Sequence, residues 1–361
     1  MSVNRSLNTP TRNPLLEQAL RDKLQQRAEI GGRAGELEAL ALRLGLVQNT
    51  LKPRFSAPQI ALFASDHGLA VDGIGRRDVR STAQQVAGVL ESRLPVAAFA
   101  RIQGLGLSVV DAGVAEAVAP HARLLSRKIA HGTRNARISA AMSLDQAHAA
   151  IRAGMEIADA LPGNVIACAG FGVGGHESAA LVLSRLSDTG LADLLVRGPA
   201  DLPEEFSRLM LVLQGAQARH RELTDPVEVL AAFGGFEVAM MVGVMLVSGS
   251  KRHLVIVDGM AACAALMVAS RIAPAITDYC VFARSHSHEG LTEALALFQA
   301  TPLLEVGMEC ADGTGATLAW PLVRSAGALL TDVVDGDAGS AERPAEPDAF
   351  AESGAGSSSR Y

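Results

Sequence analysis

The sequence is poor in cysteine and in aromatic residues, and each shortage argues against a class of protein. Among 361 residues there are four cysteines, and aromatic residues make up 4%. No two cysteines form a C-x-x-C pair, so the sequence indicates neither a zinc site nor a disulfide framework. The four, which we expect to be reduced and mostly buried thiols in a cytoplasm, are Cys168, Cys263, Cys280 and Cys310.

Positive charge is also scarce. The chain has 32 lysine and arginine residues against 38 aspartate and glutamate residues, and no dense basic stripe. Binding to a phosphate backbone needs clustered cations, and binding to unpaired bases needs aromatic platforms, so a nucleic-acid partner is disfavoured. The first 14 residues are polar and lack the apolar core, about 7–15 residues long, of a secretory signal.

One apolar run approaches the length of a membrane span. Residues 231–249 include Glu237 and four glycines, and Lys251, Arg252 and His253 follow them. A buried helix explains this run better than a transmembrane helix, because an ionisable residue is costly inside a bilayer. We therefore expect no membrane partner.

The composition allows a large folded unit between two polar ends. With 49% apolar residues, the chain suits one large α/β domain with an appendage, or two domains. Residues 1–14 are polar, and residues 335–361 are rich in Gly, Ser, Ala, Pro and acids, so both ends are predicted to be disordered. The helical spacing of residues 15–46 predicts one or two helices.

Short apolar runs alternate with helical patterns through the folded unit. Strands are predicted at 59–64, 107–111, 165–169, 193–196, 254–257 and 280–283. Helices are predicted at 80–92, 143–160, 177–186, 205–218, 227–247, 261–272 and 292–298. This alternation is typical of a doubly wound, mostly parallel α/β sheet with helices on both faces. Ligands bind beyond the carboxyl ends of such strands, so the polar clusters that follow the strands should converge on one site.

A glycine-rich segment, G-F-G-V-G-G-H-E-S at 170–178, follows one predicted strand and precedes a helix. Its G-x-G-x-x-G spacing alone is weak support for a dinucleotide site, and no acidic residue closes the following strand as that motif expects. A tight packing turn is the plain alternative. We favour a phosphate or ribose cradle, because glycines admit a ligand close to the backbone and a helix N-terminus favours anions.

Two further polar clusters follow predicted strands. In S-D-H-G at 65–68, the adjacent Asp66 and His67 should face different ways, so either a helix-capping turn or a substrate contact is possible. In S-H-S-H-E at 285–289, two histidines and a glutamate could suggest a metal. The sequence defines no third partner, so hydrogen bonds to a ligand are the better interpretation. No G-x-S-x-G nucleophile motif is present.

Asp312 heads a Gly-Thr-Gly turn that opens an apolar, helix-like run. It could simply cap that helix. It could also be a general base, because a half-buried carboxylate can have a raised pKa and accept a proton from a ring N–H. A base beside backbone N–H groups that face an anion suits displacement chemistry on a phosphorylated sugar.

Several motifs occur in one order along the chain: S-D-H-G at 65–68, G-T-R-N at 132–135, A-M-S at 141–143, F-G-G-F-E at 233–237, G-V-M at 243–245, V-D-G at 257–259, R-I-A-P at 271–274, S-H at 285–286 and D-G-T-G-A at 312–316. This series resembles the nicotinate-nucleotide:5,6-dimethylbenzimidazole phosphoribosyltransferases, the CobT family of cobalamin lower-ligand synthesis. The resemblance runs from about residue 31 to residue 331.

The resemblance implies a fold and a reaction. The fold would be one α/β domain at 15–334, with a small helical lobe from about 15–50 and 300–334, in a cytoplasmic homodimer. A benzimidazole nitrogen would displace nicotinate from nicotinate mononucleotide and give α-ribazole 5′-phosphate with inverted configuration. No metal and no cofactor would be needed. Asp312 would be the base, and the residues expected to bind substrate are Asp66, His67, Gln85, Gly172, Gly174, Gly175, His176, Ser178, Ser285, His286, Gly313, Thr314 and Gly315.

The chain departs from the family pattern at both positions where the family has a glutamate in its active-site motifs. Asp312 stands where the family has Glu, and Gly170 stands where the phosphate-side loop has its acid. Residues 175–178, G-H-E-S, replace the asparagine and threonines of that loop, and Gly88 replaces an asparagine near Gln85. Two alternatives therefore stay open: a paralogue that binds a nucleotide or base as a regulatory or accessory protein, or an enzyme that recruits His176, Glu177 or Glu289.

Overall fold

The computed structural model describes residues 8–74, 80–195, 203–285, 289–308 and 313–333. Several predictions concern parts that are not described and stay predictions: the tail at 335–361, the residues His286, Cys310 and Asp312, and the side chain of Glu289.

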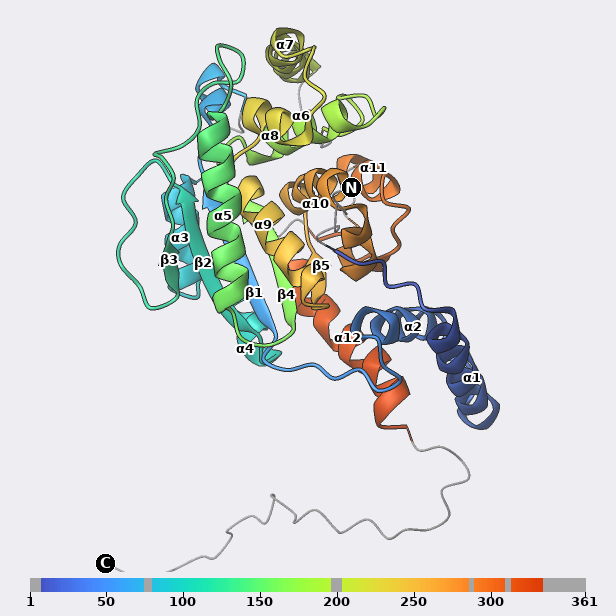
Figure 1. The fold of residues 1–361 in the computed structure, drawn as a ribbon. Coiled ribbons are helices and arrows are strands. Elements are labelled where there is room, and N and C mark those ends of the chain that lie inside the picture. The colour runs from blue at the N-terminus through green and yellow to red at the C-terminus, as the bar shows by residue number, and fades with distance from the viewer. Residues whose placement is uncertain (1–7, 75–79, 196–202, 286–288, 309–312, 334–361) are drawn as a thin grey trace, which may run out of the picture.

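A single parallel sheet forms the centre of the described chain (Figure 1). Its order is β3-β2-β1-β4-β5-β6-β7, and every neighbouring pair is parallel. The chain therefore winds outward in one direction from β1 and in the other from β4, and the predicted doubly wound fold is confirmed. The strands are β1 Gln59–Ser65, β2 Gly106–Gly113, β3 Leu124–Ser126, β4 Val165–Phe171, β5 Leu254–Val257, β6 Cys280–Arg284 and β7 Pro302–Leu304.

The strand at 193–196 was predicted wrongly. Residues 191–195 form a turn whose Leu194 and Leu195 are buried without a partner strand. A short buried apolar run does not by itself distinguish a strand from a packed turn. The prediction also lacks β3 and β7, which are edge strands of three residues each and too short to show a period.

Helices cover both faces of the sheet and enclose two apolar layers. Along β1, Ile60 and Leu62 join one layer while Ala61 and Phe63 join the other, as the alternation of side chains in a strand requires. The first layer packs against α1 Pro14–Gly31, α2 Glu36–Gln48, α3 Thr82–Leu90, α4 Pro95–Ile102 and α12 Thr314–Thr331. The second packs against α5 Leu144–Ala160, α6 Gly175–Leu186, α7 Pro203–Arg219, α8 Pro226–Phe233, α9 Phe236–Ser250, α10 Met260–Ile272 and α11 Glu289–Ala296. Two short 3₁₀ helices, η1 Gly68–Asp72 and η2 Pro274–Tyr279, complete the elements.

The long apolar run at 231–249 lies in the core as parts of two helices. The chain is extended at Gly234 and Gly235, so α8 ends and α9 begins where one helix was predicted. Helix α9 is buried along nearly its whole length against α5. A Cβ atom on Gly154 of α5 would overlap the Met240 carbonyl oxygen of α9, so these backbones touch. Among the described residues, no helix combines the length and hydropathy of a membrane span.

Residues 8–13 are docked on the core, so the prediction that residues 1–14 are disordered is wrong for this part. Asn8 is fully buried and its amide donates to Leu246 O at 3.0 Å. The Tyr279 hydroxyl donates to Thr9 O at 2.7 Å, and Thr11 N donates to the Asp278 carboxylate at 2.9 Å. Composition failed as a guide because hydrogen bonds, rather than apolar side chains, hold this segment.

Candidate functional site

Polar residues gather where the central strands end, as the parallel fold requires. The turn after β1 carries Asp66 and His67, the turn after β4 runs from Gly172 to Gly175, and Asp258 follows β5. These segments contact one another: Asp66 N donates to Gly113 O at the end of β2, and His67 N donates to Val173 O. The described polar clusters thus share one edge of the sheet.

Asp66 is a structural crosslink in this arrangement. One carboxylate oxygen accepts from Thr82 Oγ1 at the start of α3 at 2.5 Å, and the other accepts from Ala115 N at 2.7 Å. The Thr82 oxygen in turn accepts from Val173 N at 3.0 Å. Both oxygens of Asp66 are therefore engaged by protein donors, but Asp66 caps no helix, because Ser81 is the N-cap of α3 and no side chain caps η1.

The His67 side chain points away from Asp66 and into a buried ion pair. Its Nε2 atom lies 3.1 Å from Glu237 Oε1, and both side chains are almost fully buried. Burial lowers the pKa of His67, but attraction to nearby carboxylates, above all Glu237, outweighs burial, so the net pKa is raised. The imidazolium is thus favoured. Sequence reasoning quoted Glu237 only as part of a motif and missed its pairing with His67.

The glycine segment is pressed against the turn after β1. A Cβ atom on Gly172 would overlap Ser65 O, and Gly174 has φ +83° and caps α6. Ser178 is buried and donates to Phe233 O at 2.6 Å, so its hydroxyl anchors α6 to α8. These contacts match the interpretation of the segment as a tight packing turn. The segment also places the first residues of α6 at the shared edge of the sheet.

Three further polar residues lie at or near this edge, and their side chains differ in burial. His176 is half-buried within the first turn of α6. Glu177 follows it, and burial raises the pKa of its carboxyl, although its own backbone N–H and His67 partly offset that effect. On the other side of the edge, Ser285 is half-buried and its backbone N–H donates to Leu304 O at 3.0 Å.

A second buried ion pair holds the start of α12. Arg284 Nε donates to Asp258 Oδ1 at 2.9 Å, and both side chains are almost inaccessible to solvent. Asp258 Oδ2 accepts from Gly313 N at 2.8 Å and Ala316 N at 2.9 Å. Asp258 was quoted in a motif, but its role as the cap of α12 was not predicted.

This pair changes the expected roles of the turn at 313–315. The Gly313 N–H, predicted to face a ligand anion, already donates to Asp258. Thr314 is fully buried, and a Cβ atom on Gly315 would crowd the Arg284 side chain. The described part of this turn is thus packed into protein, while Asp312, just before it, lies outside the described residues.

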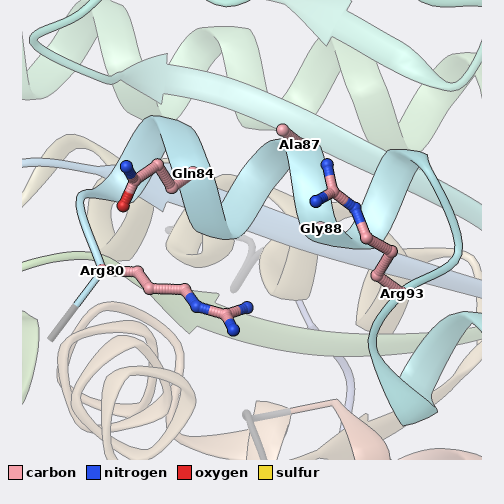
Figure 2. A pocket seen from close by; sticks show the side chains of 5 residues that line it. All are labelled: Arg80, Gln84, Ala87, Gly88 and Arg93. Carbon is pink, nitrogen blue, oxygen red and sulfur yellow. The ribbon is translucent and has the colours of Figure 1, made fainter.

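A recess of about 330 Å³ lies on the outer side of α3 (Figure 2). Arg80 and Arg93 extend guanidinium groups along it, and Gly88 contributes no side chain to its wall. The Gln85 amide donates to Arg80 O at 3.0 Å and supports the chain at the rim.

Among the described residues, no group of His, Cys, Asp and Glu side chains has the arrangement of a metal site.

Comparison with known proteins gives the relatives of this chain. A family model described as a phosphoribosyltransferase matches residues 9–339. A nicotinate-nucleotide–dimethylbenzimidazole phosphoribosyltransferase of Cupriavidus taiwanensis is 40% identical over 323 residues, which cover 89% of this chain and 92% of the relative. One from Dechloromonas aromatica is 39% identical over 324 residues, covering 88% and 93%. The crystal structure of such an enzyme from Thermus thermophilus matches with a TM-score of 0.82 at 27% identity, covering 88% of this chain and 96% of that one.

Proposed function

The chain belongs to the nicotinate-nucleotide–dimethylbenzimidazole phosphoribosyltransferase family, and from this membership we propose its reaction. It transfers the phosphoribosyl group of nicotinate mononucleotide to 5,6-dimethylbenzimidazole or a related base. The bond between C1′ and the nicotinate nitrogen breaks, and a bond from C1′ to a benzimidazole nitrogen forms on the opposite face. The incoming ring loses its N–H proton, nicotinate leaves, and the product is α-ribazole 5′-phosphate.

The observation that supports this proposal best is the convergence of family motifs on one sheet edge. The S-D-H-G turn, the glycine turn and the start of α12 come from three distant parts of the chain and meet there. We assign Asp312 as the base that takes the ring proton. The glycine turn at 172–175 holds the phosphoribosyl group. Asp258 and Arg284 are positioning residues, because they fix the helix that Asp312 precedes.

Catalysis here needs placement more than covalent chemistry. A bound base directly behind C1′ avoids the entropic cost of a bimolecular encounter. The two buried ion pairs connect the segments that form this edge, His67 with Glu237 and Asp258 with Arg284. We also propose that the protein is a cytoplasmic homodimer without cofactor, and light scattering on the purified protein would measure its mass in solution.

The test is release of nicotinate. Purified protein is mixed with nicotinate mononucleotide and dimethylbenzimidazole, and nicotinate is separated and measured over time. We expect turnover, and Asp312→Asn should lower kcat by roughly two to four orders of magnitude, the usual contribution of a general base. Asp159→Asn is the matched control, because Asp159 is an exposed carboxylate that pairs with Lys251 at the surface.

Unchanged turnover in Asp312→Asn would remove the assigned role of that residue. A second function is kept because the contacts of Gly313 and the carboxylate of Glu177 leave fewer free donors for an anion. In that case the protein binds a nucleotide or base without turnover, as a regulatory or accessory paralogue. Binding of either ligand by calorimetry, with no nicotinate released, would favour this second function.

A further inference from the structure

Two helices begin on either side of the His67 imidazole, and each carries a glutamate in its first turn. Helix α6 carries Glu177, and α9 carries Glu237. A Cβ atom on Gly175 would lie 3.4 Å from His67 Nε2, and one on Gly235 would overlap the imidazole ring and the Glu237 carboxylate. The ring is therefore enclosed between two helix N-termini, and glycine is needed at Gly235 to admit it.

The charges in this cluster do not balance when both carboxyl groups are ionised. Glu237 and His67 form a buried pair at 3.1 Å, so one carboxylate already matches the imidazolium. His67 also attracts Glu177, and burial raises the pKa of the Glu177 carboxyl. The fully ionised cluster thus holds one excess negative charge, and it lies at the first turn of α6.

That excess charge conflicts with an anion at the glycine turn. The backbone N–H groups at the start of a helix favour an anion, and here a side-chain carboxylate is already present among them. A phosphate brought to the same turn meets a like charge in a partly enclosed place, where repulsion is screened less than in water. One proton added to the cluster removes the conflict.

We propose that Glu177 determines the charge of the donor that the glycine turn accepts, and that the donor phosphate binds as the Glu177–His67–Glu237 cluster takes up one further proton. The inference rests on the proposed function, since it assumes that the phosphoribosyl donor binds at this turn. It makes Glu177 a specificity-determining residue. An unphosphorylated nucleoside would bind at the same turn without the added proton.

The charged groups that face Glu177 can be named. His67 faces it from the turn after β1 and connects it with Glu237 and with Asp66, which also attracts His67. His176 adjoins Glu177 in the first turn of α6 and is half-buried. Arg271 of α10 donates to Leu186 O at the far end of α6, and Arg208 of α7 donates to Asp72 O.

The experiment measures the donor KM against pH for two donors, nicotinate mononucleotide and the unphosphorylated nicotinate riboside. Between roughly pH 5.5 and pH 8.5, we expect the wild-type KM for the nucleotide to rise by about tenfold per pH unit once the cluster loses its proton. In Glu177→Gln the rise should be lost, and the preference for nucleotide over riboside at high pH should increase about tenfold or more. The riboside KM should be nearly independent of pH in both proteins.

Two controls separate this inference from other effects. The phosphate has its own second ionisation near pH 6, but that ionisation is common to all variants and cancels in the comparison with Glu177→Gln. Glu228→Gln, at an exposed site on α8, should keep the wild-type profile. If the wild type and Glu177→Gln have the same pH profile and the same donor preference, the inference is wrong.

Calorimetry keeps the test decisive if turnover is absent. Nucleotide binding measured in buffers of different ionisation enthalpy gives the number of protons taken up, which we expect to approach one at high pH for wild type and zero for Glu177→Gln. Glu177→Thr serves as a second variant if Glu177→Gln does not fold. Failure of the proposed function would appear as no nicotinate release with proton-linked binding intact, whereas failure of this inference would appear as binding without proton uptake.

Discussion

The buried pair between Asp258 and Arg284 allows a prediction whose size follows from the structure. Asp258→Ala leaves the Arg284 guanidinium buried without its carboxylate and removes the acceptor of two backbone N–H groups at the start of α12. Removing one partner of a buried ion pair costs about 3–5 kcal/mol. Domains have about 5–15 kcal/mol of unfolding free energy, so the variant should lose at least about a fifth of its stability.

The assay is urea unfolding followed by circular dichroism, with the free energy of unfolding taken from linear extrapolation. A double-mutant cycle adds Arg284→Met and the double variant. We expect the double variant to be more stable than the sum of the single losses predicts, by about 1–3 kcal/mol, because both charges of the buried pair are then removed together. In transferase assays, Asp258→Ala should lower kcat, since the helix that follows Asp312 loses its cap.

The chain offers a matched pair for comparison. Lys251 and Asp159 also form an ion pair, at 2.6 Å, but their side chains are 36% and 63% exposed. The same cycle on this pair should give at most about 1 kcal/mol, because solvent screens exposed charges. The reasoning is refuted if Asp258→Ala costs less than about 1 kcal/mol, or if the two cycles give equal coupling energies.

Two further predictions concern the core. Gly154→Ala should cost about 1–3 kcal/mol of unfolding free energy, because its methyl group would overlap Met240 O. Gly31→Ala, which has open space around it, should leave the unfolding free energy unchanged. Equal effects of the two substitutions in urea unfolding would contradict the close approach of α5 and α9. The thiols of Cys168 and Cys280 are buried, and burial raises the pKa of both, that of Cys280 to about 12. They should therefore react with a thiol reagent at pH 8 only after unfolding, and rapid labelling of the native protein at either site, read by mass spectrometry, would show that the sheet opens.

The parallel sheet could be predicted because both faces of its central strands are buried, which makes each strand a continuous apolar run. The motif order predicted the family, and the comparisons confirm it. The same signal misled at 193–196, where an apolar run is a buried turn. It also gave no sign that Gly234 and Gly235 divide one apolar run into two helices.

The pairings within the candidate site could not be predicted in the same way. Asp258 follows β5 and Arg284 is the last residue of β6, and their contact depends on β5 and β6 being neighbours, which composition does not reveal. His67 and Glu237 are separated in sequence by β2, β3 and β4. The alternation of side chains along a strand did predict that Asp66 and His67 face different ways, but it could not name Thr82 and Glu237 as their partners.

The docked residues at the beginning of the chain have a consequence for biosynthesis. Asn8 leaves the ribosome 238 residues ahead of Leu246, whose carbonyl receives its amide. At about 5–20 residues per second, that interval lasts roughly 10–50 seconds. During this time the segment has no binding surface, so it can attach only after α9 and η2 have formed. A bulky fusion placed directly before Asn8 should therefore hinder this docking step rather than the pairing of β1, β2 and β4.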